Sequence, residues 1–119
     1  MQDYKKLVVW QKGHELTKAI YKATKDFPKE ELFGLTSQLR RATTSIPTNI
    51  VEGCGRGTNP DLARFVQIAS GSAYEVEYLI FLSFESGYLN KKEFAALDKN
   101  SNDIKRMLFA LYEKIKNNK

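Results

Sequence analysis

The sequence contains one histidine and one cysteine, and neither has the neighbours that metal binding or catalysis requires. His14-Glu15 begins like the zinc-protease signature, but Lys18 stands where that signature needs its second histidine. Cys54 would need a nearby base to act as a nucleophile, so we interpret it as a free thiol in a glycine-rich loop. Two such ligands are also too few for a structural zinc site. We therefore expect a non-enzymatic protein with no catalytic residue, metal or cofactor.

The glycine-rich stretch of residues 53–57 invites comparison with phosphate-binding loops. A dinucleotide-binding fingerprint follows a β-strand, and a Walker motif continues with Lys-Ser or Lys-Thr, but this stretch has neither feature. We interpret it as a flexible loop that ends a helix. A weaker alternative stays open, in which Arg56 and the free N–H groups that begin the next helix hold one phosphate.

Three glutamates lie on predicted helices that a bundle could bring together: Glu52, Glu75 and Glu77. The di-iron sites of helical bundles also need two Glu-x-x-His pairs, and one histidine cannot supply them. We prefer a packing role, in which Asn49 and Glu52 serve backbone groups that Pro47 leaves free. In the same interpretation, Gly71-Ser72 lets a neighbouring helix approach closely, and Glu75 pairs with an arginine.

The basic side chains are the remaining candidates for binding. The net charge is +5 and the isoelectric point is about 9.3, which permits a nucleic acid or another anionic partner without requiring one. Solvated surface charge is an equally favoured interpretation, because the chain has no RNP, zinc-finger or zipper motif and most of its aromatic residues lie at core spacing. The candidate phosphate contacts are Arg40, Arg41, Arg56, Arg64, Lys105 and Arg106.

Four stretches have the apolar period of an α-helix, and none has the strict alternation of a β-strand. We predict helices over residues 9–27, 35–52, 60–86 and 91–115, with one short helical turn in the linker of residues 27–34. Asn59 and Asn90 are the predicted N-caps, Gly87 is a predicted C-cap, and Pro47 is expected to kink or break the second helix. The short connections predict an all-α fold, an antiparallel up-down-up-down four-helix bundle that forms a single domain over residues 1–119.

Membrane and secreted proteins are not favoured by this sequence. No apolar run approaches the eighteen or so residues that cross a bilayer, and the first residues lack the pattern of a signal peptide. A single cysteine is typical of a reducing compartment, so we expect a cytoplasmic protein without a membrane partner.

The most distinctive stretches are residues 10–12, 27–35, 38–42, 45–53, 64–65, 68–72 and 87–89, together with Leu16 and Glu75. Combined, they resemble the four-helix-bundle family named after the 23S rRNA intervening-sequence protein, and the resemblance covers about residues 8–112. Gly13 and Val51 stand where alanine is expected in that family, and neither departure upsets the fold.

The resemblance implies a small bacterial protein that assembles as a ring-like homopentamer and has no enzymatic activity. A relative of the family, the accessory variability determinant of diversity-generating retroelements, is a basic pentameric barrel that binds nucleic acid and reverse transcriptase. The third predicted helix has a second apolar stripe besides its main one, and the fourth has apolar heptads; we expect these two to form the subunit interface. The stripe consists of Ile68, Leu79 and Leu82, and the heptads of Phe94, Leu97, Ser101, Ile104, Leu108, Leu111 and Ile115.

Two functions therefore stay open. In the first, a ring raises the charge of +5 per chain to about +25, and RNA binds through its phosphates with release of counterions. In the second, the ring is a protein-interaction scaffold or accessory subunit without a direct nucleic-acid role, and the charge is incidental.

Overall fold

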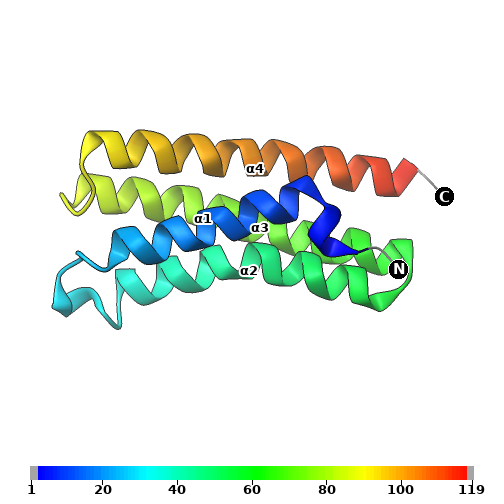
Figure 1. Ribbon diagram of the computed structural model, residues 1–119, viewed down its shortest axis with the longest axis horizontal. Helices are drawn as coiled ribbons and strands as arrows, with labels where there is room; N and C mark the ends of the chain where they lie inside the picture. The colour runs from blue at the N-terminus through cyan, green and yellow to red at the C-terminus, as the bar shows by residue number, and fades with distance from the viewer. Residues whose placement is uncertain (1–2, 118–119) are drawn as a thin grey trace.

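Four long helices run antiparallel to one another, up and down along the molecule (Figure 1). The structure is a computed structural model that describes residues 3–117, so the first two and last two residues of the predicted domain lie outside the described part. The elements are η1 (Tyr4–Lys6), α1 (Val8–Thr24), η2 (Lys29–Glu31), α2 (Leu35–Arg56), α3 (Asn59–Glu85) and α4 (Lys91–Asn117). Each long helix packs against its neighbours in the chain, and α4 returns to pack against α1. The predicted all-α bundle is confirmed, and α2 and α4 lie across its diagonal.

The core is built from the apolar stripe of each helix. The apolar residues that recur at the helical period along α2 are all buried: Leu35, Leu39, Ala42, Ile46 and Ile50. Side chains at 0–1% exposure come from all four helices, and burial of one such side chain contributes about 1.5–3 kcal/mol. The largest are Leu16, Ile20, Leu39, Ile46, Ile50, Val66, Val76, Ile80, Ile104 and Leu108.

α2 continues through Pro47, where the sequence predicted a kink or a break. Proline has no N–H to donate, which leaves the Thr43 carbonyl without its intrahelical partner. Thr17 of α1 lies beside that carbonyl: its hydroxyl donates to the Gly13 carbonyl at 2.8 Å, and the Thr43 carbonyl is a second, longer acceptor at 3.4 Å. Gly13 makes this approach possible, because a Cβ there would lie only 3.2 Å from Ile46 Cγ2. α2 therefore stays helical across Pro47 while it packs against α1 at Gly13 and Thr17. The Asn49 side chain donates to the carbonyl and hydroxyl of Ser45, not to the Thr43 carbonyl.

The boundaries of two helices differ from those predicted. α1 ends at Thr24 rather than at residue 27, although Phe27 still inserts into the core. α2 extends to Arg56, so the glycine-rich stretch is helical up to that residue and is not a flexible loop. Within residues 53–57, only Gly57 has a left-handed backbone, with φ of 85° at the C-cap. The sequence missed this extension because glycine has a low helix propensity in isolation, which packing overrides here.

The predicted caps hold with one shift. Asn90 and Glu93 form the expected capping box at the start of α4, and Gly87 has the left-handed backbone of a helix-ending residue, with φ of 82°. Thr58, not Asn59, caps α3, since its hydroxyl oxygen accepts from the N–H of Asp61 at 3.3 Å. The short helical turn that was predicted in the linker between the first two helices is present as η2.

Candidate nucleic-acid interface

Arg56 and Arg64 lie against the same aromatic ring, where α2 ends and α3 begins. Their guanidinium carbons lie 5.0 and 4.6 Å from the centroid of Phe65. Phe65 is fixed by a close approach of the two helices, because a Cβ on Gly53 would lie 3.0 Å from the Phe65 Cβ. Arg56 is also 3.6 Å from Glu52 across one helical turn, in a pair that stays about half exposed. We call this group, formed by Arg56, Arg64 and Phe65, the arginine end.

Stacking on a ring orders a guanidinium without using its hydrogen-bond donors. Both arginines are exposed, whereas the ring beneath them is buried. Phe65 lies at a core position by the helical period of α3, and the structure shows that the same buried ring also supports two cations. The adjacency of Arg64 and Phe65 was the available signal, but the contribution of Arg56 depends on the unexpected extension of α2.

More cations gather at the same end of the bundle. The C-terminal turns of α4 and the N-terminal segment of the chain both lie here, beside the turn between α2 and α3 (Figure 1). They carry Lys5, Lys6, Lys114 and Lys116, all exposed. Asp3, Asp61 and Glu113 offset part of this charge, but basic side chains outnumber acidic ones at this end.

Arg40 and Arg41 point to different neighbours, as expected for adjacent residues on a helix. Arg40 binds the C-terminal turn of α1, where its Nε donates to the Thr24 hydroxyl at 2.8 Å and its Nη2 to the Tyr21 carbonyl at 3.3 Å. Arg41 is exposed, donates to the Ser37 hydroxyl at 3.1 Å and lines the groove between α2 and α3. Arg40 therefore holds two helices together, and Arg41 keeps most of its donors free.

Lys105 and Arg106 lie on α4, across the diagonal from α2. Lys105 is only 17% exposed and pairs with Glu77 at 2.8 Å, with its ammonium over the ring of Tyr74. Arg106 is exposed and pairs with Asp103 on its own helix. The six predicted contacts thus fall into three separate groups, and only Arg56 and Arg64 share an anchoring side chain.

The groups considered for catalysis or metal binding lie apart. Cys54 is buried in α2 rather than exposed in a loop, and burial, aided by the charge of Asp3, raises the pKa of its thiol. His14 is exposed and stacks on Trp10, with ring centroids 5.0 Å apart. Across residues 3–117, no group of three or more His, Cys, Asp or Glu side chains is close enough to hold a metal ion. The same residues include no helix long and apolar enough to span a bilayer.

The packing role predicted for the second and third helices is only partly correct. Ser72 does meet α2, with its hydroxyl 2.8 Å from that of Ser45. Gly71 does not, since it is exposed and a Cβ there would meet nothing within 4 Å among the described residues. Glu75 faces Arg41 across a shallow groove, without an ion pair in the described part of the chain.

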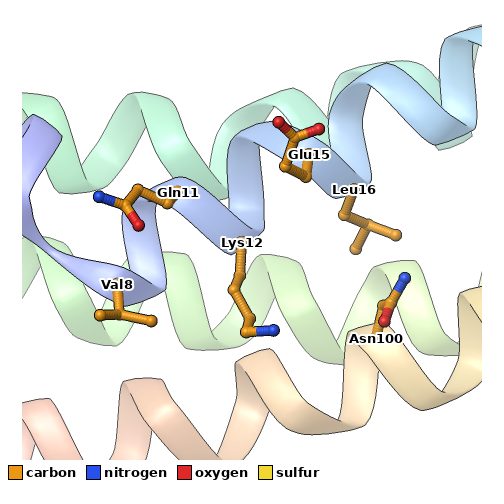
Figure 2. Close-up of a pocket in the computed structure, with 6 residues that line it drawn as sticks. All are labelled: Val8, Gln11, Lys12, Glu15, Leu16 and Asn100. Atoms are coloured by element: carbon orange, nitrogen blue, oxygen red, sulfur yellow. The ribbon is translucent and has the colours of Figure 1, made fainter.

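A shallow cavity of about 330 Å³ lies between α1 and α4 (Figure 2). Five of its lining residues come from α1, and Asn100 comes from α4. Lys12 and Glu15 point in different directions, so their charged groups do not converge on one ligand (Figure 2). The cavity lacks the convergent polar groups of a small-molecule site.

Comparisons with known proteins agree with this architecture. A family model described as 23S rRNA-intervening sequence protein matches residues 5–110. A crystal structure from Bacteroides thetaiotaomicron VPI-5482, described as a protein with unknown function from the S23 ribosomal protein family, is similar with a TM-score of 0.82. It is 26% identical, and the match covers 89% of this chain and 96% of that chain. A search of curated proteins gives no match.

Proposed function

This chain belongs to the 23S rRNA-intervening sequence protein family, and from that premise we propose that it is a non-enzymatic RNA-binding protein that assembles as a homopentameric ring. The arginine end is proposed to contact RNA phosphates. One observation carries the proposal: two exposed guanidinium groups are held on one buried ring at the most basic end of the bundle.

The chemistry of the arginine end suits phosphate. A guanidinium presents a planar fork of donors that matches two phosphate oxygens, and such contacts position a protein on RNA without reading its sequence. Phe65 holds the guanidinium groups of Arg56 and Arg64 at 5.0 and 4.6 Å from its ring, so both would lose less side-chain freedom on binding a phosphate. The first turn of α3 begins beside them, and its backbone N–H groups favour an anion as well.

The other four predicted contact residues are proposed to contribute less to phosphate binding than Arg56 and Arg64. Arg41 and Arg106 have exposed guanidinium groups and add positive charge along the sides of the bundle. Arg40 and Lys105 already have protein partners, so they contribute to the long-range field more than to direct contact. A ring of five copies would bring the charge to about +25, and counterion release would then give strong salt dependence.

The test is RNA binding across a salt series, with the mass of the protein checked by light scattering. We expect the affinity to fall steeply with salt, and Arg56→Ala with Arg64→Ala to lower both the affinity and the salt slope, by about one per lost phosphate contact. Lys25→Ala with Lys29→Ala is the matched control, because it removes two exposed cations from the opposite end. Absence of binding at low salt by an intact oligomer, or equal losses from both pairs, would overturn the proposal.

The second candidate function is a protein-interaction scaffold. It is favoured by exposed aromatic side chains on α3, which a phosphate backbone does not need. Binding of RNA that is weak and insensitive to salt, with the ring intact, would favour this function over the first.

A further inference from the structure

α3 carries a row of apolar side chains on the side that faces away from the bundle. Ile68, Tyr74, Tyr78 and Phe81 are between 42% and 62% exposed, and with Gly71 they recur every three or four residues along the helix. We call these five residues the α3 face. A contiguous exposed apolar surface of this kind marks an interaction site more often than a solvated one.

Gly71 lies in the middle of the α3 face, and packing within the chain does not account for it. It is exposed, its backbone is helical, and the space where a Cβ would stand is open. Glycine weakens a helix interior relative to alanine, and a common reason for it is the close approach of another backbone. Here that backbone has to come from outside the described chain.

Charge indicates what kind of surface covers the α3 face. From residue 65 to the end of α3 the helix has no lysine or arginine, but it has Glu75, Glu77 and Glu85. Lys105 neutralises Glu77, which leaves the other two glutamates beside the aromatic row. The aromatic part of the α3 face thus has more acidic than basic groups beside it, with Lys105 over Tyr74 as its one described cation, and it favours a basic, apolar protein surface.

The chain itself has such a surface on its other side. Tyr21, Leu32 and Phe33 line a shallow pocket together with Arg40 and Arg41. Phe33 is 93% exposed, and Leu32 is half exposed. We call this the Phe33 pocket. It lies on α1, α2 and their linker, and Arg41 is the member that also lines the groove beside Glu75 of α3 in the same chain. Because α1 makes no contact with α3, Tyr21 cannot meet the α3 face of its own copy.

We infer that the α3 face of one copy packs against the Phe33 pocket of a second copy, with the acidic rim of the first beside the arginines of the second. This inference rests on the self-association in the proposed function and names the surfaces that would produce it. A contact between two different surfaces of identical chains repeats from copy to copy and closes into a ring when the rotation permits. Most of the α4 heptads that the sequence favoured as an interface are buried in the bundle itself, with Phe94 and Leu111 partly buried. Of the second α3 stripe that the sequence favoured, Leu79 is buried as well, and Ile68 alone belongs to the α3 face.

The test is the solution mass of the full chain by light scattering, with circular dichroism to show that each variant is folded. Tyr78→Arg and Phe33→Ser change exposed side chains on the two surfaces, and each is expected to reduce the oligomer to monomers. Phe109→Ser is the matched control, because Phe109 is 66% exposed on α4, outside both surfaces, and its loss is expected to leave the mass unchanged. An unchanged mass for either Tyr78→Arg or Phe33→Ser would overturn the inference.

Mixing tests whether two different surfaces meet. An equimolar mixture of Tyr78→Arg and Phe33→Ser retains one intact pair of surfaces, so we expect it to form dimers that neither variant forms alone. Monomers only, from the mixture, would overturn the head-to-tail contact. A wild-type chain that is monomeric would overturn both this inference and the proposed ring, whereas an intact oligomer that fails to bind RNA would overturn the RNA function alone.

Discussion

The two ends of the bundle are closed in different ways. At one end, which we call the latch end, Glu31 accepts two hydrogen bonds, from the Leu35 backbone N–H at 3.1 Å and from the Tyr88 hydroxyl at 2.9 Å. Phe27 packs on the ring of Tyr88, so the α1–α2 linker is joined to the α3–α4 turn. At the arginine end, α2 and α3 are joined by a turn of two residues and approach closely at Gly53.

The two ends therefore differ in how many of their polar groups remain available to a ligand. The acceptors and donors of the latch end bond mainly to one another, so they stabilise the fold and offer little to a ligand. Arg56 and Arg64 rest on the Phe65 ring, a contact that uses none of their hydrogen-bond donors, and Glu52 lies beside one donor of Arg56. The arginine end therefore depends on packing for its shape, and its charges are left for binding.

Gly53→Val should have the largest effect on stability, because the arginine end depends on packing. A side chain there would collide with Leu62 and Phe65, whose nearest atoms lie 3.0 Å from the position of a Cβ. Overpacking of this kind costs about 1–3 kcal/mol, measured as the free energy of unfolding in urea. Gly55→Ala is the matched control two residues on, where a Cβ would meet nothing, and we expect it to be neutral or stabilising. Equal losses from the two variants would contradict the role of close packing.

Glu31→Ala should have the next largest effect, at the latch end. It removes the acceptor that serves the first turn of α2 and the one that holds Tyr88, and we expect a loss of about 1–2 kcal/mol in the free energy of unfolding. The adjacent Glu30→Ala is the control, because Glu30 is exposed and should change stability by less than about 0.5 kcal/mol. If both variants unfold at the same urea concentration, the latch does not stabilise the bundle.

The apolar stripes could be predicted from the sequence, because burial in a bundle follows the helical period. Ile46, Ile50 and Leu108 are fully buried where that period places them. Helix ends were harder, since local propensity and long-range packing compete there. The local sequence around Gly53 and Gly55 is typical of a loop, but both lie in α2. Gly53 is held there by its contact with α3.

The candidate site was predicted only as a set of residue types. Arg56 and Arg64 were both named, but their shared ring depends on how far α2 extends past Gly53. Likewise, because Arg40 and Arg41 are neighbours in a helix, their side chains are expected to point in different directions. The sequence did not indicate that Arg40 bonds to the end of α1. Side-chain partners on other helices depend on the rotation of each helix, which a single sequence does not specify.

Arg56→Ala and Arg64→Ala should have small effects on stability, in contrast with their expected effect on RNA binding. Exposed cation–π contacts contribute about 0.5–1 kcal/mol each, and the exposed pair with Glu52 adds little. Urea unfolding of each variant, beside wild type, measures the loss. A cost as large as that of Gly53→Val would mean that these arginines hold the end together, and the contrast between the two ends would fail.

The smallest effect should be a dependence on alkaline pH that comes from the latch end. The hydrogen bond to the Glu31 carboxylate raises the pKa of Tyr88 above its ordinary value near 10, and partial burial adds to the rise. Between the unfolded and folded pKa values the folded chain holds a proton that the unfolded chain has lost, so stability falls as the pH rises through this window. Below pH 10 the contribution is fully present.

Tyr88→Phe has no such proton, and its unfolding free energy, followed in urea from pH 8 upward, should decline less steeply than that of wild type. Parallel curves for the two proteins would show that the tyrosine is not held by Glu31 in solution.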